Sequence, residues 1–525
     1  MRCCSVRAAR AGVAALALSA CLAAAGVATP AAAQGAPATA WTAVPDAFVP
    51  GHDGSRIVPT PQASTPGEGA FLLTAGTSVV LHADTPAIRL AASLLQQDAA
   101  RQHGLRPQVR GAASDGPGAA GPAIRVGVLG RDGAPATTAA PVERPEGYLL
   151  EVGPAGVTVL GADERGAVHG LHSLRQLLGG GPEVAAVTVR DWPALPWRVA
   201  MVYLDASSDT VNGRLLPILA ELKFNAVLVM SDHVHWDSAP ELHQPQGASR
   251  AAAERLAATA RAHLLEPIPL LETLSHAEWF FANGANAELR ADPTAARAFV
   301  MDPTRPELYD RLLPLIDELI DIFEPRWLHI GHDEVRNVHP FPATPEQREI
   351  GYGRLFTGSV ARLHEHLAAR GVGTMLWDDE LVAPEVRALW SALPDDLTVV
   401  SWRYLPAGGY PRLELVADAG FRALGASWFE PDNVSAMART LARLRDEGAD
   451  AAGLVQTRWT GYFGNATMLR GQYRQVYAYV TAAAAAWNPE AAAPPGAPGW
   501  FRAAWLADQQ GGARSGCLLY TSPSP

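Results

Sequence analysis

The sequence has few cysteines and almost no lysine. Three of its four cysteines, Cys3, Cys4 and Cys21, lie near the amino end, and Cys517 lies near the carboxyl end. The body of the chain therefore offers neither a disulfide nor a thiolate metal site. Lys223 is the one lysine among 42 basic residues, so Schiff-base or pyridoxal chemistry would depend on that single side chain.

Acidic residues outnumber basic residues, and the formal net charge is −11 over 525 residues. A chain of this charge is a poor partner for nucleic acid or for an anionic membrane surface. Beyond the amino-terminal segment, no apolar run reaches the length that a membrane span requires. We therefore expect a partner that is neither nucleic acid nor a lipid bilayer.

The first 33 residues have the pattern of a bacterial signal peptide. Three arginines precede an apolar run over residues 11–27, and Ala31-Ala32-Ala33 supplies a small-residue cleavage site. The pattern predicts a secreted or periplasmic protein. A lipid anchor at Cys21 is the alternative, because the sequence Leu-Ser-Ala-Cys resembles a bacterial lipobox, but the residues after Cys21 stay apolar and favour simple cleavage.

The rest of the chain divides into two predicted domains. A linker spans residues 34–45, a small α+β domain 46–190, a second domain 191–488, and a tail rich in proline and alanine 489–525. In the small domain, strands are expected over residues 71–81, 123–129, 148–152 and 157–160, and helices over 86–101 and 165–178. This predicts a sheet covered on one side by helices. No acids or histidines cluster there, so we interpret it as a packing or positioning module.

The second domain repeats a strand-then-helix pattern eight times. The expected strands span residues 198–204, 226–230, 267–271, 327–330, 374–376, 398–400, 422–426 and 453–457, and helix-period segments lie between most of them, for example 215–222, 251–263, 306–323, 354–369, 434–445 and 468–487. Eight such units in about 300 residues predict a TIM barrel of the α/β class. A doubly wound open sheet would usually carry a Gly-rich phosphate loop after its first strand, and none occurs there.

Polar and aromatic side chains follow the expected strand ends, where the active site of a barrel forms. They are Asp205, Asp232, His233, His235, Trp236, Glu272, His276, Asp333, Glu334, Trp377, Asp378, Asp379, Trp402, Tyr404, Trp428, Glu430, Trp459 and Tyr462. A tryptophan follows each of the last four strands, and flat aromatic faces pack against a pyranose ring while carboxylates bind its hydroxyls. The pattern points to a sugar ligand, although tryptophan also fills protein cores. Lys223 precedes the second strand and so lies at the opposite end, which excludes an aldolase.

Asp333 and Glu334 are the strongest candidates for catalysis. They follow an apolar strand that ends in Ile330 and Gly331. Successive residues of a strand point to opposite faces, so we expect the two carboxylates to leave the strand at different angles and to take different roles. Taken alone, such a pair is more typical of an ordinary acidic loop or of a helix N-terminus, where carboxylates interact favourably with the helix dipole.

Several segments together resemble glycoside hydrolase family 20, the β-N-acetylhexosaminidases, over residues 57–487. The sequence His-Ile-Gly-His-Asp-Glu at residues 329–334 is similar to the family's strand followed by Gly-Gly-Asp-Glu, with His332 in place of a glycine. Further similar segments are Trp197-Arg198, Lys223-Phe224-Asn225 with Ser231-Asp232, Ile268 to His276, Trp377 with Asp378 and Glu380, Trp459, and Glu146 to Leu178.

The resemblance implies a hydrolase that removes β-linked N-acetylhexosamine (GlcNAc or GalNAc) from a glycan by a retaining, substrate-assisted mechanism, without a metal or another cofactor. Glu334 would be the general acid and base, and Asp333 would orient the acetamido nitrogen. The substrate-binding residues that it implies are Arg198, Asp232, His276, Trp377, Asp378, Trp402, Trp428 and Trp459. A scaffold role is the alternative for His276, and an ion pair within the barrel is the alternative for Arg198.

The chain also departs from the family pattern at three places. Ser427-Trp428-Phe429-Glu430 stands where the family has Tyr-Leu-Asp, whose tyrosine holds the acetamido oxygen. Gly461 stands where the family has a glutamate, and Ser207-Ser208-Asp209 replaces a segment that contains an arginine. The substrate is therefore expected to differ from a simple terminal N-acetylglucosamine.

Two other functions stay open. The altered sugar-binding residues favour a non-catalytic or differently specific sugar-binding barrel, although binding alone needs no proton donor. A metal-dependent barrel hydrolase could use His233 and His235 with Asp232 or Asp333 as ligands. Such a site usually takes further histidines from later strand ends, and no histidine follows Trp377.

Overall fold

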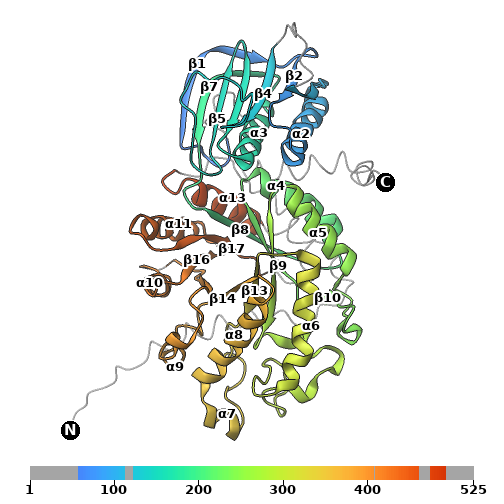
Figure 1. The fold of residues 1–525 in the computed structure, drawn as a ribbon, viewed down its shortest axis with the longest axis vertical. Coiled ribbons are helices and arrows are strands. Elements are labelled where there is room, and N and C mark those ends of the chain that lie inside the picture. The colour runs from blue at the N-terminus through green and yellow to red at the C-terminus, as the bar shows by residue number, and fades with distance from the viewer. Residues whose placement is uncertain (1–56, 113–121, 407, 460–472, 492–525) are drawn as a thin grey trace, which may run out of the picture.

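The structure is a computed structural model that describes residues 57–112, 122–406, 408–459 and 473–491. It consists of a small domain with a seven-stranded sheet and a closed eight-stranded barrel (Figure 1). The predicted signal peptide with Cys21, the linker, Gly461, Tyr462 and nearly all of the predicted tail lie outside the described residues.

The small domain is a mixed sheet with two helices. Its strands, in spatial order, are β1 (Ala63–Leu72), β7 (Glu183–Asp191), β5 (Tyr148–Gly153), β6 (Gly156–Gly161), β4 (Ala123–Val128), β2 (Ser78–Leu81) and β3 (Gln108–Gly111). Helices α2 (Pro86–His103) and α3 (Glu164–Leu178) pack against each other, and α3 lies across the central strands (Figure 1). The predicted α+β arrangement, with β5 and β6 as an antiparallel hairpin, is confirmed.

The prediction of one strand over residues 71–81 was wrong. A turn interrupts it, because the Thr77 amide donates to the Thr74 carbonyl oxygen at 3.1 Å and the Thr77 hydroxyl accepts from the Thr74 amide at 3.0 Å. The chain before the turn is β1, an exposed edge strand that pairs antiparallel with β7, with an irregular register between Pro66 and Ala70. Its proline, glycines and exposed side chains give no alternating apolar pattern, so the sequence did not reveal its first half.

All eight predicted barrel strands are present. They are β8 (Trp197–Tyr203), β9 (Ala226–Met230), β12 (Glu266–Thr273), β13 (Trp327–Gly331), β14 (Gly373–Trp377), β15 (Thr398–Trp402), β16 (Arg422–Ser427) and β17 (Ala451–Gln456), and β17 closes the barrel on β8. The larger helices of this domain are α4 (Ser208–Glu221), α5 (Arg250–Ala262), α6 (Pro306–Phe323), α8 (Tyr352–Ala368), α10 (Pro411–Asp418), α11 (Pro431–Asp446) and α13 (Tyr473–Trp487). The TIM-barrel prediction is confirmed.

Alternation along each strand separates two cores. In β8, Val199, Met201 and Tyr203 point into the barrel and join its inner core. Ala200 and Val202 belong instead to the larger core between the barrel and its helices. A residue that continues the inward set past the carboxyl end of a strand therefore lies over the barrel mouth, and the neighbouring residues do not.

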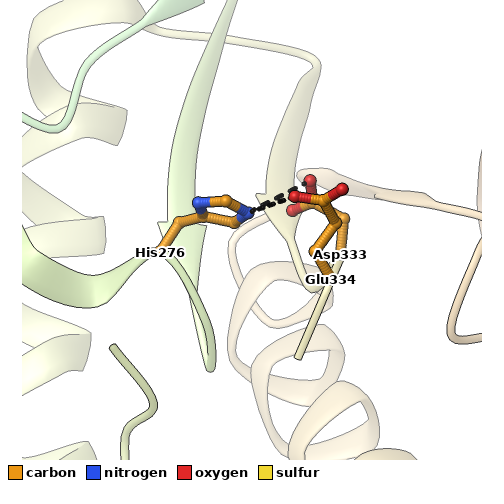
Figure 2. Close-up of side chains that lie close together, drawn as sticks. All are labelled: His276, Asp333 and Glu334. Carbon is orange, nitrogen blue, oxygen red and sulfur yellow. Dashed lines mark ion pairs between the residues drawn. The ribbon is translucent and has the colours of Figure 1, made fainter. Parts of the chain in front are cut away.

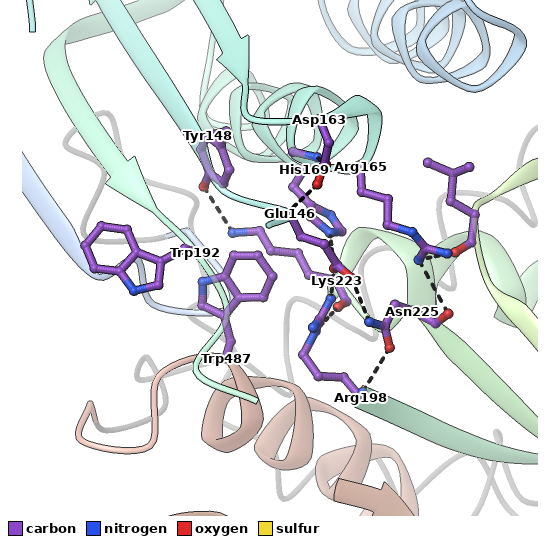
Figure 3. Close-up of polar contacts among 12 residues, drawn as sticks. Glu146, Tyr148, Asp163, Arg165, His169, Trp192, Arg198, Lys223, Asn225 and Trp487 are labelled. Atoms are coloured by element: carbon purple, nitrogen blue, oxygen red, sulfur yellow. Dashed lines mark hydrogen bonds and ion pairs between the residues drawn. The ribbon is translucent and has the colours of Figure 1, made fainter. Parts of the chain in front are cut away.

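A buried ionic cluster joins the small domain to the amino end of the barrel (Figure 3). The Lys223 ammonium, which precedes β9, lies 2.9 Å from the Asp191 carboxylate at the end of β7, and both side chains are fully buried. Asp191 also accepts hydrogen bonds from the Tyr148 hydroxyl at 2.7 Å and from the Trp487 indole at 2.7 Å. Lys223 is thus a structural residue at the end of the barrel opposite the predicted active site.

Arg198 belongs to the same cluster (Figure 3). Its guanidinium pairs with Glu146 of the small domain and donates to the backbone carbonyl oxygens of Lys223 at 2.7 Å and Leu195 at 3.0 Å. The pKa of Glu146 lies well below its usual range, because Arg198 and His169 outweigh the opposite effect of burial. The prediction that Arg198 binds substrate was wrong. Arg198 stands at the beginning of β8, and its guanidinium makes its contacts at the interface between the two domains.

Among the described helices, none is both long enough and apolar enough to cross a membrane.

We predict that Asp191→Asn destabilises the folded chain by roughly 3–5 kcal/mol, because it leaves the Lys223 ammonium buried without its counter-charge. The measurement is the urea midpoint of unfolding. Asp450→Asn is the matched control, since Asp450 forms an exposed pair with Arg422, and its expected effect is within about 0.5 kcal/mol. Equal effects of the two substitutions would contradict the assignment of a stabilising interface pair.

Candidate active site

The centre of the site is a left-handed turn at the end of β13. Gly331, His332 and Glu334 have φ values of 71°, 69° and 52°. Gly331 is needed there, since a Cβ atom would collide with the Glu272 side chain. The Ser275 hydroxyl donates to the Asp333 carbonyl oxygen and fixes the turn to the loop after β12.

The turn brings both predicted catalytic carboxylates to one point (Figure 2). His276 Nε2 lies 3.6 Å from Asp333 Oδ2 and 3.4 Å from Glu334 Oε2. The expectation that the two carboxylates diverge was wrong, because it assumed a continuous strand, whereas positive φ values at His332 and Glu334 end the strand alternation. The two groups can therefore act on the same part of a ligand.

His276 supplies the positive charge between these carboxylates. Burial alone would lower the pKa of His276, but Asp333 and Glu334 outweigh it and raise the pKa to about 9. The ring packs edge-on against Phe299 with the centroids 4.7 Å apart. His276 is consequently an imidazolium at neutral pH, held in place on its apolar side by an aromatic ring.

Two further acids lie behind Asp333. The Glu272 amide donates to Asp232 Oδ1 at 3.0 Å, and both side chains are buried. Burial raises the pKa of Asp232 to about 8 and, together with Asp333 and Asp232, raises the pKa of Glu272 well above its usual range. Burial also raises the pKa of Asp333. The group therefore carries fewer negative charges near pH 7 than it has carboxyl groups. Asp232, predicted to bind substrate, is placed next to the site but beneath its surface.

His332 stands where the resemblance to family 20 implies a glycine. It is buried, and its two ring nitrogens hold the turn in place. Its Nε2 lies 3.0 Å from the Ser359 hydroxyl of α8, and its Nδ1 lies 3.0 Å from the Thr273 hydroxyl of β12. Burial lowers the pKa of His332 to about 4, so the ring is neutral near pH 7. These contacts fix the backbone that carries Asp333 and Glu334.

Asp379 is a site residue that the list of predicted binding residues lacked. Its Oδ2 accepts the Glu334 amide at 2.8 Å, and its Oδ1 accepts the Trp402 indole N–H at 3.1 Å. The alternation in β14 could have identified it, since Met375 and Trp377 belong to the inner core and Leu376 does not. Two residues beyond Trp377, Asp379 lies over the barrel mouth.

The prediction that Asp378 binds substrate is wrong. Asp378 continues the outward set of β14, is fully buried, and accepts the Ser401 hydroxyl at 2.6 Å and the Trp402 amide at 3.2 Å. Arg412 Nε lies 3.3 Å from its Oδ2. Asp378 therefore holds the end of β15 in place.

Three of the four predicted tryptophans, Trp402, Trp428 and Trp459, gather at the mouth of the barrel, whereas Trp377 is buried beneath it. Trp402 stacks on Tyr404 with centroids 5.1 Å apart and planes at 25°. Trp428 meets Tyr404 edge-on at 5.7 Å, and the Trp459 indole donates to the Tyr404 hydroxyl at 2.9 Å. Trp377 lies below, 5.9 Å from Trp459, and is fully buried. We call Trp377, Trp402, Tyr404, Trp428 and Trp459 the aromatic wall.

The two histidines that a metal-dependent hydrolase was expected to use, His233 and His235, both contact Gln244. His233 Nδ1 lies 3.1 Å from the Gln244 side-chain nitrogen, and His235 Nε2 lies 3.0 Å from the Gln244 carbonyl oxygen. Within the described ranges, the one group of three His and carboxylate residues with ligand atoms within 4.8 Å of one another is His276, Asp333 and Glu334. Those three could hold a divalent cation, whereas His233 and His235 are not part of the group.

Two family models match the chain. Glycosyl hydrolase family 20, domain 2, matches residues 54–192, and glycosyl hydrolase family 20, catalytic domain, matches residues 253–427. The two matches together cover more than half of the sequence. The chain belongs to glycosyl hydrolase family 20.

Two curated relatives match parts of this family 20 chain in sequence, and solved structures match most of it in fold. A lacto-N-biosidase from Bifidobacterium bifidum is 26% identical over 296 residues, which are 54% of this chain and 26% of that protein. Hexosaminidase D from Bos taurus is 28% identical over 147 residues, 27% of this chain and 42% of that protein. The chain thus spans less than half the length of either relative. The structure of the family 20 β-N-acetylhexosaminidase from Streptomyces coelicolor A3(2) aligns with a TM-score of 0.64 at 21% identity, covering 90% of this chain and 98% of that one, and shares the fold.

We predict that His276 stabilises the family 20 chain in a pH-dependent way. The folded-state pKa of about 9 exceeds the unfolded value of about 6.5, so the stabilisation is complete below pH 6.5 and is lost as pH rises through 9. The difference in thermal midpoint between the wild type and His276→Asn should therefore shrink between pH 6.5 and pH 9. A difference that stays constant over this range would show that the imidazolium is not the stabilising form.

Proposed function

We propose that the protein is a glycosidase that removes β-linked N-acetylhexosamine from glycans by a retaining, substrate-assisted mechanism. The observation that carries the proposal is the meeting of Asp333 and Glu334 at His276, with one oxygen of each carboxylate within 4.8 Å of the other. In a substrate-assisted glycosidase the nucleophile is the substrate's own acetamido group, so the rule for the spacing of two catalytic carboxylates does not apply. Two carboxylates at one point support a proton donor that acts beside a group that orients the acetamido nitrogen.

Exposure supports a division of roles between the two acids. The Glu334 side chain is 30% exposed, and the Asp333 side chain is 12% exposed. The more accessible Glu334 is suited to reach the glycosidic oxygen as a general acid. The more buried Asp333, beside the aromatic wall, is suited to accept the N–H of the 2-acetamido group.

The proposed reaction has two steps. Glu334 gives its proton to the leaving oxygen while the acetamido carbonyl oxygen attacks C1, which breaks the glycosidic bond and forms an oxazolinium ring. Asp333 holds the amide N–H and stabilises the positive charge that develops on that ring. Glu334, now a carboxylate, takes a proton from water, and the resulting hydroxyl attacks C1 and restores the acetamido group with net retention.

The aromatic wall supports a sugar as the ligand. Trp402, Trp428 and Trp459 are each partly exposed at the barrel mouth. Aromatic faces of this kind pack against the apolar face of a pyranose ring, and the carboxylates beside them bind its polar groups. We therefore propose a glycan with a terminal N-acetylhexosamine as the partner, and no cofactor enters the reaction.

A second candidate is a related glycosidase with a different specificity. The lacto-N-biosidase relative and Trp428, which stands where the family has a tyrosine, both favour it. Aryl lacto-N-biosides are therefore included among the substrates to be tested.

We also propose that the protein is exported from a bacterial cell. The support is the arginine-flanked apolar run followed by Ala31-Ala32-Ala33, which has the pattern of a cleaved signal. Protein recovered from the medium or periplasm should begin near Gln34. A mature chain that begins at Cys21 would support the lipid-anchored alternative instead.

We predict that the wild type hydrolyses aryl β-N-acetylglucosaminide or N-acetylgalactosaminide and that the first product is the β-anomer, as followed by proton NMR. Glu334→Gln should lower kcat/KM by about 10²–10⁴-fold, because it removes the general acid and base. The matched control is Glu414→Gln, which changes an exposed side chain on α10 paired with Arg443, and it should leave kcat/KM unchanged. A thiazoline that mimics the oxazoline should inhibit the wild type.

An α-anomeric first product would contradict the retaining mechanism. Sugar binding without turnover of any of these substrates would favour the non-catalytic alternative. Turnover of the lacto-N-bioside alone would favour the second candidate.

A further inference from the structure

A hollow lies between two loops beside the catalytic pair. It is open to solvent, has a volume of about 260 Å³, and is formed by residues 290–300 after β12 and residues 339–343 after β13. We call it the lateral hollow, and its charged and aromatic lining residues are Arg290, Asp292, Arg297, Phe299, His339 and Phe341. The aromatic wall is built at the ends of β14 to β17 instead, so the acids at the end of β13 stand between the wall and the hollow.

Phe299 connects the lateral hollow to the catalytic pair. Its ring packs edge-on against His276 with the centroids 4.7 Å apart, and the Arg297 guanidinium carbon lies 5.0 Å from the centroid of the same ring. His276 Nε2 in turn lies 3.4 Å from Glu334 Oε2. In the proposed function the terminal sugar lies at the aromatic wall and Glu334 protonates the oxygen that links it to the rest of the glycan. The lateral hollow is therefore placed to receive the leaving part of that glycan.

Arg290 is the cation of the hollow that lacks an acidic partner within the described part of the chain. Its Nε atom is buried without a hydrogen-bond partner, and its guanidinium carbon lies 5.8 Å from the centroid of the Phe281 ring. A charge that is partly removed from water and has no counter-charge is unfavourable, and an anion at its other N–H groups would stabilise it. Arg290 is thus a positive charge that a ligand can neutralise.

The other charged residues of the lining already have partners. Arg297 pairs with Glu278, and both side chains are exposed. Asp292 Oδ1 accepts the amide and the hydroxyl of Thr294 at 2.8 and 2.6 Å. His339 Nε2 lies 3.1 Å from the Arg297 carbonyl oxygen. Two guanidinium groups and one carboxylate line the hollow, so its lining is positive in a chain whose formal net charge is −11.

An acidic sugar matches both parts of this lining. A guanidinium binds the oxygens of a carboxylate or a sulfate group through charge-assisted hydrogen bonds, which are stronger than bonds between neutral groups. The rings of Phe299 and Phe341 offer apolar surface to the faces of a sugar ring. A neutral sugar would use the aromatic surface and leave the Arg290 charge without a partner.

We propose that the lateral hollow binds an acidic sugar in the leaving part of the glycan, with Arg290 as the partner of its carboxylate or sulfate group. The inference rests on the proposed function and adds a substrate class to it. The preferred substrates are glycans in which the terminal N-acetylhexosamine is β-linked to a chain that contains a uronic acid or a sulfated sugar.

The test compares oligosaccharides that differ only in charge. The first alternates N-acetylhexosamine with uronic acid and has a terminal N-acetylhexosamine. The second is the same chain after its carboxyl groups have been reduced to primary alcohols, and the third is this reduced chain carrying O-sulfate groups. The wild type should hydrolyse an acidic form with a kcat/KM roughly 10-fold above that of the neutral form, as expected for one hydrogen bond to a charged group. Preference for the first or the third form identifies the group as carboxylate or sulfate.

Arg290→Gln assigns the preference to one residue. It should lower kcat/KM for the preferred acidic form by roughly 10-fold and for the neutral form much less, because it removes the charge that the acidic group binds. Arg422→Gln is the matched control, since it makes the same change in net charge at an exposed pair with Asp450 on the barrel, and the preference should be unchanged. An equal loss of the preference in both variants would show an effect of overall charge and overturn the inference.

A second measurement covers the case in which Arg290→Gln does not fold. In a crystal structure of Glu334→Gln with the preferred acidic oligosaccharide, an oxygen of its acidic group should lie within hydrogen-bond distance of the Arg290 guanidinium. An acidic group bound elsewhere would overturn the inference.

The aryl N-acetylhexosaminides separate this inference from the proposed function, because they have no leaving sugar. Turnover of these substrates by a wild type that hydrolyses the acidic and neutral oligosaccharides equally well would overturn the inference and leave the proposed function standing. A wild type that hydrolyses neither the aryl glycosides nor any of the oligosaccharides would overturn both.

Discussion

The repulsion among carboxyl groups at the end of β13 is the constraint on which the rest of the site depends. Asp232, Glu272, Asp333 and Glu334 all approach the same region, and the first three are buried. Two devices offset the repulsion. His276 brings one positive charge into contact with Asp333 and Glu334, and burial keeps protons on the acids behind them. The acids therefore differ in protonation because their surroundings differ, which is what acid and base roles require.

The barrel and its active end could be predicted from the sequence because both depend on periodic patterns. The eight buried strands are short apolar runs, and their ends carry the acids and aromatic residues. The sequence could also have shown that Asp379, and not Asp378, faces the site. The alternation of Met375, Leu376 and Trp377 determines which of the two acids lies over the barrel mouth. Tyr404 obeys the same alternation, two residues beyond Trp402.

Other features depend on tertiary contacts that leave no local pattern. Arg198 looks like a ligand-binding residue in the sequence, and only the docking of Glu146 against the amino end of the barrel shows its role. The left-handed turn at His332 and Glu334 is equally hidden, because neither residue type favours positive φ as glycine does. It is held by hydrogen bonds between His332 and the hydroxyl groups of Thr273 and Ser359, which belong to a neighbouring strand and to a helix.

The edge strand β1 has a consequence for the behaviour of the protein at high concentration. An exposed sheet edge is a template for pairing with a strand of another molecule. In β1, Pro66 lacks an amide hydrogen, and the register shifts between Pro66 and Ala70, so the edge cannot offer a regular ladder of donors and acceptors. The irregularity that hid this strand in the sequence therefore protects the small domain against intermolecular β-sheet growth.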